Sequence, residues 1–222
     1  MQKQESKKQT NTVIKWILAT VILVTLIIGG AFISGTFYPN VWTVEKIEAE
    51  VHKKELNQVK LLGLREPEFE YTDKTSFLLA TSKCVEYLNY TTDRLSRVPT
   101  SIIIAMAGVE SGWGTSRFAN EGNALFGVRT WDLKNVAHMK AKGNPDASWG
   151  VKKYKTKCQS VNDMIKILNR HPAYKEFRIE REKQMDSGKW NYRTLMVLMN
   201  AWSTNPDYHE IILQAIVDNK LP

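Results

Sequence analysis

The sequence predicts an α+β domain that is mainly helical, preceded by one N-terminal transmembrane helix. Residues 16–44 contain no charged side chain, and apolar residues recur at helical spacing through most of residues 71–222. A stretch containing Gly and Trp at 124–157 interrupts that spacing. The composition, with 43% hydrophobic and 24% charged residues over 222 positions, is that of a globular protein and excludes wholesale disorder.

The uncharged run begins with 18 apolar or small residues from Trp16 to Ile33 and reaches 23 residues at Tyr38. About 20 helical residues cross the core of a bilayer. A helix packed on the surface of a globular domain would show a polar stripe, which this run does not have. We therefore expect residues 16–38 to form an uncleaved membrane anchor. A cleaved signal peptide is the alternative, although its apolar core is normally shorter.

The charges that flank this run predict its orientation. Four Lys against one Glu precede it, whereas residues 45–60 carry four acidic and four basic side chains. The basic side of a first span normally stays in the cytoplasm, although Lys and Arg counted alone give four on each side. We expect residues 1–15 to be a cytoplasmic tail, and the chain after the span to lie in the periplasm or outside the cell.

Residues 39–70 mix charges and follow a loose helical rhythm, which we interpret as a stalk or linker. The domain at 71–222 carries +7 of the chain's +8, because the +3 of the tail is largely offset by −2 in residues 45–70. A basic domain suits an anionic polymer. Given the expected topology, that polymer is not a nucleic acid.

The first helices of the domain follow from periodicity. Residues 74–90 predict a helix with one apolar face, formed by Phe77, Cys84 and Leu88. Pro99 is suited to the first turn of the next helix. Residues 102–109 are apolar throughout, so this second helix should be buried on all sides.

The rest of the domain continues this pattern. Ser160 with Asp163 resembles a capping box at the start of a helix, and further helices are expected at 192–201 and about 206–219. The alternating apolar and polar residues within 124–157 indicate loops and short strands instead. The result is a helical domain with a small β-containing lobe.

The chain has too few cysteines for a disulfide framework or a four-Cys zinc site. A disulfide between Cys84 and Cys158 and two free buried thiols are both compatible with the sequence. The four histidines show no metal-ligand spacing, and neither a phosphate loop nor a nucleophile elbow is present. We expect no metal and no cofactor, and the sequence does not define an oligomeric state.

Glu110 is the most informative residue, since it follows eight apolar residues and precedes Ser111-Gly112-Trp113-Gly114. A carboxylate at the end of an apolar helix, beside an aromatic ring, is partly desolvated, which raises its pKa. A carboxylic acid that stays protonated near neutral pH can donate its proton to a glycosidic oxygen. A Glu that simply ends a helix in solvent is the alternative.

Four sequence blocks in order strengthen the catalytic interpretation. They are Glu-Ser-Gly-Trp-Gly with Ser-Arg-Phe-Ala in 110–119, Asn-Ala-Leu-Phe-Gly at 123–127, Leu-Asn-Arg-His-Pro-Ala-Tyr at 168–174, and Ser-Thr-Asn-Pro-Asp-Tyr at 203–208. Together they resemble the glucosaminidase domain of bacterial cell-wall hydrolases, and its Bax-like branch in particular. The resemblance covers about residues 75–222.

This resemblance implies a lysozyme-like fold with a groove between two lobes. It also implies an endo-β-N-acetylglucosaminidase that hydrolyses the bond after N-acetylglucosamine in the glycan strands of peptidoglycan. Glu110 matches the catalytic acid of the family. The substrate-binding residues implied are Trp113, Asn123, Phe126, Trp202 and Tyr208.

The sequence departs from the family at Trp202, where a Tyr is usual; an indole N–H donates a hydrogen bond but cannot accept one. The second carboxylate is not marked by any block. Asp146 is favoured because Asn144-Pro145-Asp146 is a turn in the β-containing lobe, with Asp132 and Glu121 as alternatives. With no second carboxylate, the acetamido group of the substrate would act as the nucleophile.

Two other functions remain open from the sequence. A lytic transglycosylase also uses one Glu followed by Ser and leaves a 1,6-anhydro end, but it usually has a Gly-Leu-x-Gln block where this chain has Asn-Ala-Leu-Phe-Gly. A non-catalytic protein that tethers the membrane to the wall is the second alternative, and the departure at Trp202 and the unmarked second carboxylate motivate it.

Overall fold

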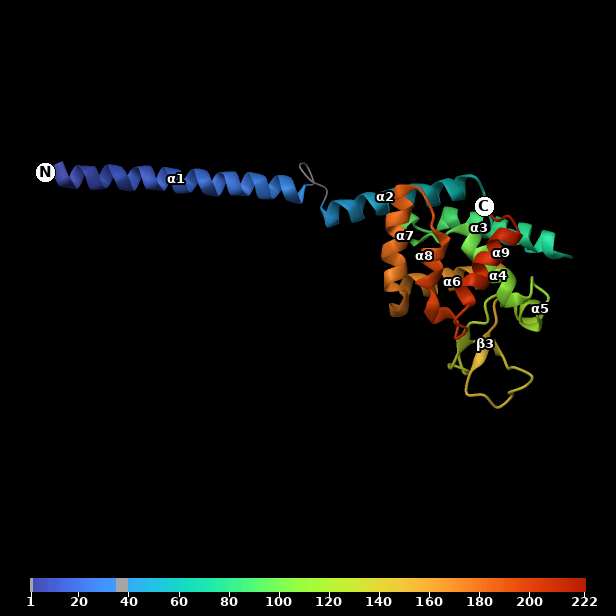
Figure 1. Cartoon of the computed structure of the whole chain (residues 1–222). Coiled ribbons are helices and arrows are strands. Elements are labelled where there is room, and N and C mark those ends of the chain that lie inside the picture. The colour runs from blue at the N-terminus through green and yellow to red at the C-terminus, as the bar shows by residue number, and fades with distance from the viewer. Residues whose placement is uncertain (1, 35–39) are drawn as a thin grey trace. The chain divides into compact units, whose positions relative to one another are not determined.

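The computed structural model of the chain describes residues 2–34 and 40–222 (Figure 1). The chain divides into two compact units, residues 1–54 and 55–222, which we describe separately. Residues 35–38 of the predicted membrane anchor lie outside the described residues.

The first unit is built from α1 (Gln2–Ile33) and the start of α2 (Val41–Leu61). Within α1, Val13–Ile33 has a mean hydropathy of 2.5 and no buried residue, so it is long and apolar enough to cross a membrane. Asn40 joins the two helices: its amide nitrogen donates to the Ile33 carbonyl at 3.0 Å, and its Oδ1 caps α2 by accepting from the Thr43 N–H at 2.9 Å. Helix α2 supplies helical structure within the predicted stalk.

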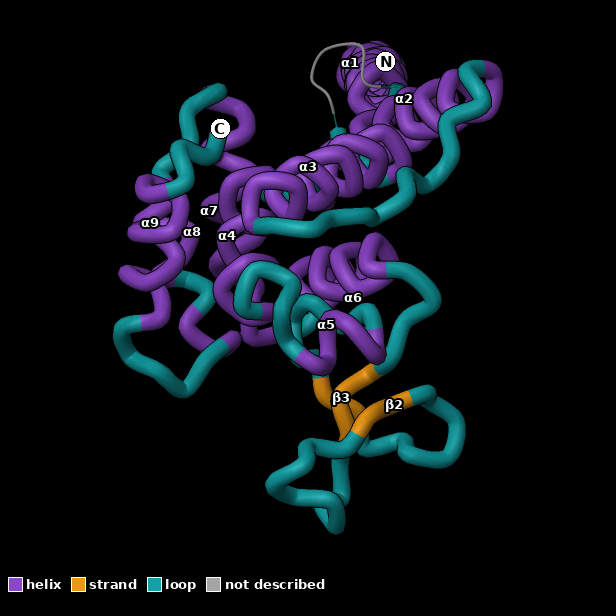
Figure 2. The backbone as a smooth tube through the Cα atoms, turned by 90° about the vertical axis from the view of Figure 1, so that its right-hand side faces the viewer, coloured by secondary structure: helices purple, strands orange, loops and turns teal. Residues whose placement is uncertain are grey.

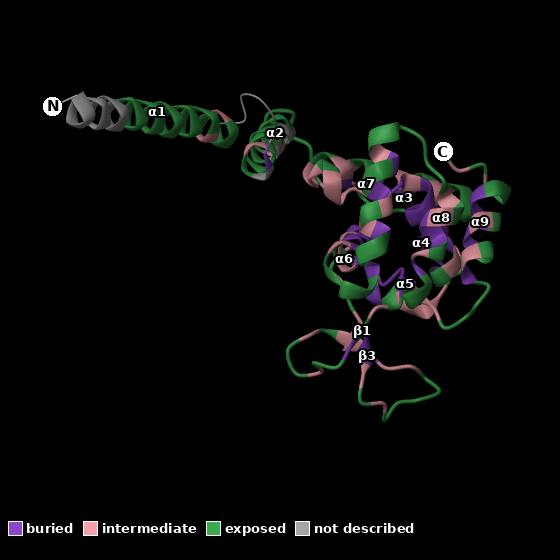
Figure 3. Cartoon of the chain, turned by 60° about the vertical axis from the view of Figure 1, so that its left-hand side comes forward, coloured by how far each residue is buried: buried purple, intermediate pink, exposed green. Residues whose placement is uncertain are grey.

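The second unit is organised around α4 (Thr100–Ser111), against which α3 (Lys74–Thr91) and α9 (Tyr208–Asp218) pack. Residues 101–108 are all buried, and Figure 3 shows α4 coloured as buried. This confirms the prediction from the uninterrupted apolar run, because a helix that is apolar on every side must be buried, either in the core of a domain or in a membrane. Three large side chains that are fully buried here are Ile102, Ile103 and Met106.

The remaining elements surround this centre. The helices are α5 (Arg117–Gly122), α6 (Lys157–Arg170), α7 (Lys175–Ser187) and α8 (Tyr192–Val197), with short 3-10 turns at Arg94–Ser96, Pro172–Tyr174 and Asn200–Trp202. Three short strands form one antiparallel sheet of order β1-β3-β2: β1 (Arg129–Thr130), β2 (His138–Met139) and β3 (Gly150–Lys152). Figure 2 shows the strands gathered at one end of the domain, beside α5. A mainly helical α+β domain with a small β-containing lobe is therefore confirmed.

A disulfide joins Cys84 in α3 to Cys158 in α6. Both cysteines are buried, and Phe77, Cys84 and Leu88 share the inward face of α3 as their spacing predicted. Of the two arrangements compatible with the sequence, the structure has the covalent one. The bond ties two helices that lie far apart in the sequence.

The predicted capping box at Ser160 and Asp163 is wrong. Helix α6 begins earlier, at Lys157, where the Thr156 hydroxyl accepts from the Gln159 N–H at 3.2 Å. The Ser160 hydroxyl accepts from the Leu125 N–H at 2.9 Å, whereas Asp163 binds the Lys152 ammonium at 2.9 Å. Ser160 and Asp163 therefore contact the 124–152 segment and do not cap the start of the helix.

Candidate active site

Glu110 lies in the last turn of the buried helix α4. The helix ends at Gly112, which has a left-handed backbone (φ 60°) and donates its N–H to the Gly108 and Val109 carbonyls. This cap ends the helix directly after Glu110 and Ser111. The Glu110 side chain therefore lies at the edge of the core, next to the domain surface. The C-terminal end of a helix carries partial negative charge, which disfavours an ionised carboxylate there.

Two side chains from the C-terminal part of the chain donate to the same oxygen of Glu110. The Tyr208 hydroxyl lies 2.7 Å from Oε1, and the Trp202 indole nitrogen lies 3.2 Å from it. The residue is exposed at the pocket, yet protein atoms crowd its carboxylate, and this burial raises its pKa; the two hydrogen bonds act in the opposite direction. Oε1 is therefore held in place, whereas Oε2 has no hydrogen-bond donor among the described residues.

The two donors are themselves fixed by packing. Tyr208 is the first residue of α9 and is buried; burial and the neighbouring Glu110 carboxylate raise its pKa, so it remains a protonated donor. Trp202 ends the 3-10 turn at Asn200–Trp202, where its ring meets Phe126 edge-on at 6.2 Å between centroids. Tyr174 lies on the other side, at 6.5 Å. This aromatic packing keeps the indole N–H directed at Glu110.

Glu110 opens into a pocket of about 540 Å³, a size typical of small-molecule sites. Its wall combines helical segments with the start of the β-containing lobe. Its lining residues are Glu110, Phe126, Gly127, Val128, Arg129, Trp131, Ile167, His171, Tyr174, Ala201, Trp202, Ser203 and Thr204. Among these residues, Glu110 is the one carboxylate and Arg129 the one permanent cation.

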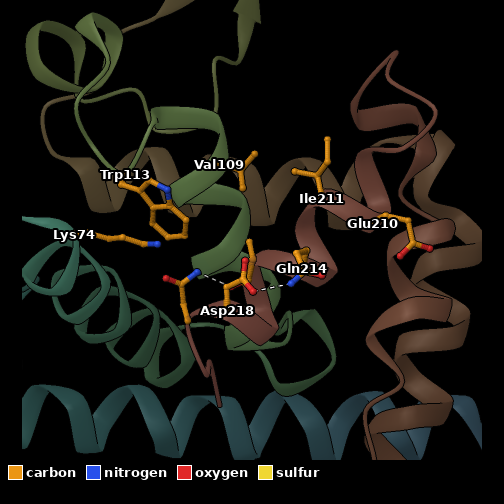
Figure 4. Close-up of a pocket in the computed structure, with 9 residues that line it drawn as sticks. Lys74, Val109, Trp113, Glu210, Ile211, Gln214 and Asp218 are labelled. Carbon is orange, nitrogen blue, oxygen red and sulfur yellow. Dashed lines mark hydrogen bonds between the residues drawn. The ribbon is translucent and has the colours of Figure 1, made fainter.

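Three of the predicted site residues line this pocket, Glu110, Phe126 and Trp202, and a fourth, Tyr208, contacts Glu110 through its hydroxyl group. Trp113 does not join them. It lines a separate hollow of about 570 Å³ between α3, α4 and α9, where its ring packs on Gly108 and carries the Lys74 ammonium 4.0 Å from its centroid (Figure 4). The backbone N–H of Trp113 donates to the Gly108 carbonyl at 2.7 Å, and this bond turns the chain back over α4.

Asn123 is also placed away from the pocket wall. It caps α5 with a left-handed backbone (φ 52°), and its amide nitrogen donates to the Tyr154 and Lys155 carbonyls at 3.1 and 3.0 Å. Its Oδ1 accepts from the Lys157 ammonium at 3.1 Å. All these partners belong to the segment that leads from β3 into α6. In this arrangement Asn123 connects the end of α5 to the segment that precedes α6.

The candidate second carboxylates do not line the pocket either. Asp146 is exposed in the loop between β2 and β3. Asp132 accepts from the Asn135 N–H at 3.1 Å within its own turn, and Glu121 pairs with Arg117 at 3.2 Å within α5. A catalytic role for Asp146 stays a prediction that this geometry does not support.

Arg129 and Trp131 are among the pocket residues that were not predicted from the sequence. Nothing in the local sequence distinguishes Arg129 from the other basic residues of the domain. Its place depends on the pairing of β1 with β3, which sets Arg129 opposite Val151. The exposed Trp131 offers a weak signal in retrospect, since a large aromatic side chain left in solvent often marks a binding surface.

The described residues hold no group of three or more His, Cys, Asp or Glu side chains placed to bind a metal ion. The pocket offers one carboxyl group with its two hydrogen-bond donors, one guanidinium, the imidazole of His171, the hydroxyl groups of Tyr174, Ser203 and Thr204, and several aromatic faces. A partly desolvated carboxyl group of this kind is suited to general acid catalysis.

Two known proteins are similar to parts of this chain. The protein Bax of Escherichia coli K12 is 30% identical over 132 residues, which is 58% of this chain but 45% of that protein. The catalytic domain of the autolysin Auto from Listeria monocytogenes, a crystal structure, is similar with a TM-score of 0.48 and 19% identity, over 75% of this chain and 94% of that one. Residues 90–221 match the glucosaminidase family model, described as mannosyl-glycoprotein endo-beta-N-acetylglucosaminidase. That match spans more than half of the chain, which therefore belongs to the glucosaminidase family.

Proposed function

We propose that the protein is a membrane-anchored peptidoglycan hydrolase that cleaves the glycosidic bond after N-acetylglucosamine, with Glu110 as its general acid. The observation that carries the proposal is the environment of Glu110. Its pKa is raised by burial, Oε1 is held by two donors, and the residue lines an open pocket. Membership of the glucosaminidase family supports the same reaction class.

The hydrogen bonds indicate which oxygen carries the proton. Because Tyr208 and Trp202 both donate to Oε1, the proton of the neutral acid resides on Oε2. Transfer of this proton to the glycosidic oxygen lets the bond between the sugar carbon and that oxygen break. The resulting Glu110 carboxylate is stabilised by the same two donors and then takes a proton from the incoming water.

The absence of another carboxylate among the lining residues supports a reaction assisted by the substrate. The acetamido oxygen of N-acetylglucosamine attacks the sugar carbon as the glycosidic bond breaks, and water then opens the cyclic intermediate. Retention of configuration is expected, as in other glycosidases that use the substrate in this way. An Asp146→Asn variant tests this route, because it should keep most of the activity that Glu110→Gln loses.

The location outside the cytoplasm is part of the proposal. Residues Val13–Ile33 supply a candidate membrane span, and the positively charged tail before it favours a cytoplasmic N-terminus. The disulfide between Cys84 and Cys158 gives independent support, since such bonds persist in oxidising compartments and are rare in the cytoplasm. The net charge of +7 on residues 71–222 suits a substrate that carries carboxylates.

A single acid in the pocket also fits a lytic transglycosylase, in which a hydroxyl of the substrate itself attacks and a 1,6-anhydro end forms. The two reactions differ by one water in the product. The tethering alternative rests on Trp202 in place of Tyr, and the hydrogen bond from Trp202 to Glu110 weakens it.

The test uses the full chain purified in detergent, with Glu110→Gln and Asp146→Asn as matched carboxylate variants. Purified peptidoglycan is digested and the new ends are identified by mass spectrometry. New reducing N-acetylglucosamine ends from the wild type and Asp146→Asn, but not from Glu110→Gln, are expected. Anhydro ends would replace the proposal by transglycosylation, and binding to sacculi without any soluble product would replace it by tethering.

A further inference from the structure

We infer that Arg129 and Trp131 form a subsite that binds a carboxylate group on the saccharide held beside Glu110. This inference rests on the proposed function and specifies which form of the glycan the pocket takes. Both residues line the same pocket of about 540 Å³ as Glu110. A sugar placed for proton transfer from Glu110 therefore presents its substituents to them.

The guanidinium of Arg129 is oriented without the use of its hydrogen-bond donors. It stacks on the ring of Trp149, with its central carbon 4.1 Å from the ring centroid. Such stacking fixes the plane of an Arg side chain and leaves its N–H groups available for a bidentate contact. In the part of the chain that the structure describes, no carboxylate pairs with Arg129 and no acceptor receives its N–H groups.

Trp131 follows β1 directly, two residues after Arg129, and its side chain lines the same pocket. It is 67% exposed, which is unusual for the largest apolar side chain. An indole face at the mouth of a pocket is suited to stacking on the apolar face of a sugar ring. The pair thus offers a platform for a sugar ring with a fixed cation beside it.

The other lining residues of the pocket leave the Arg129 guanidinium available for an anionic group of the substrate. Glu110 is the one acidic side chain among the lining residues, and its donors are Tyr208 and Trp202, so Arg129 has no partner in the wall. A guanidinium without a partner in a substrate pocket favours an anionic substituent, and its planar fork matches a carboxylate.

Peptidoglycan offers such a group from two sources. N-acetylglucosamine is uncharged, but muramic acid carries a lactyl ether whose carboxyl group is free where the stem peptide has been removed. Where the stem peptide is present, that carboxyl group is an amide and the peptide supplies carboxylates of its own. Both sources have the chemistry that Arg129 binds, and the experiment separates them.

The full chain is assayed in detergent on three soluble strands: glycan with free lactyl carboxylates, the same glycan after methyl esterification, and strands that keep their stem peptides. The wild type should prefer one of the carboxylate-bearing strands to the esterified one, and that strand identifies the source. Arg129→Gln should lower kcat/KM on it by roughly tenfold to a hundredfold, the range expected for a hydrogen bond to a charged group. The kcat/KM of Arg129→Lys should lie between those of the wild type and Arg129→Gln, since an ammonium group keeps the charge but lacks the planar fork of a guanidinium.

Lys134→Gln is the matched control, because it removes one positive charge from an exposed position of the same lobe, away from the pocket wall. It should leave the preference between carboxylated and esterified strands unchanged. Equal losses for Arg129→Gln on all three strands would overturn the inference, since they would mean that Arg129 only maintains the fold. A wild type without preference for a carboxylate would overturn it as well.

Binding separates this inference from the proposed function. Titration calorimetry of the same strands with Glu110→Gln, and with Glu110→Gln combined with Arg129→Gln, does not depend on turnover. If no strand is cleaved by the wild type, the proposed hydrolysis fails. The subsite still stands if Glu110→Gln binds the carboxylated strand more tightly than the esterified one and the double variant loses that difference.

Discussion

The disulfide between α3 and α6 should supply a large share of the stability of the domain. Cys84 and Cys158 are 74 residues apart, and both are buried in the core. In the chain-entropy model, closing a loop of this length in the unfolded chain stabilises the folded state by about 4.4 kcal/mol. A domain of ordinary stability has a free energy of unfolding of about 5–15 kcal/mol, so the disulfide should supply about 30–90% of it.

Urea unfolding of the full chain in detergent, followed by tryptophan fluorescence, measures this contribution. With a denaturant slope of about 2 kcal/mol/M, the midpoint of the oxidised protein should lie about 2 M above that of the protein reduced with dithiothreitol. The comparison keeps the same heavy atoms in both samples, so no side-chain atom is removed from the core.

The control is the double variant Cys84→Ala with Cys158→Ala, whose midpoint should not respond to dithiothreitol. Coincident midpoints for the oxidised and reduced wild type would refute the reasoning. So would the titration of two free thiols in the oxidised, unfolded protein, because the bond would then be absent. If the prediction holds, the domain gains this stability only after it reaches an oxidising compartment, which fits the proposed topology.

Two further predictions concern the site and the helix beneath it. Tyr208→Phe removes the 2.7 Å hydrogen bond that holds the pKa of Glu110 down, so that pKa should rise further. Activity that needs the protonated acid is lost as pH rises through this pKa; the basic limb of the pH profile of kcat/KM should therefore move to higher pH, and an unmoved limb would contradict the assignment. The control Tyr90→Phe, at an exposed position outside the pocket wall, should not move it. Gly108→Ala places a Cβ 2.3 Å from the ring of Trp113, which must shift; we expect a loss of about 1–3 kcal/mol in urea unfolding, and an unchanged midpoint would show that the ring has room.

Much of the helical framework could be predicted from the sequence because its signals are local. The apolar run of α4 and the inward face of α3 depend on spacing within one segment. The start of α6 was misplaced because Ser160 and Asp163 also satisfy a local pattern. Their real partners, Leu125 and Lys152, come from the preceding lobe, and such pairings depend on tertiary packing. The pairing of the two cysteines was left open for the same reason.

The same distinction between local signals and tertiary packing applies to the candidate site. Glu110 could be found because its desolvation follows from the apolar helix that ends at it. Trp113, three residues later, could not be placed from its neighbours. The direction of its ring is determined by a left-handed backbone (φ 56°) and by the space above Gly108, which lead it to the hollow shared with Lys74. Proximity to Glu110 in the sequence therefore did not predict proximity to it in the pocket.

Trp202 shows how the structure changes the interpretation of a substitution. Relative to the Tyr that the family resemblance leads one to expect, an indole lacks an acceptor and cannot ionise. Here Trp202 acts only as a hydrogen-bond donor. Its acceptor is Oε1 of Glu110, which also accepts a hydrogen bond from the Tyr208 hydroxyl. A donor is what this oxygen requires in both states of the acid: it orients the neutral carboxyl group, and it stabilises the carboxylate that remains after proton transfer. The substitution therefore keeps the one property of the position that the proposed mechanism uses.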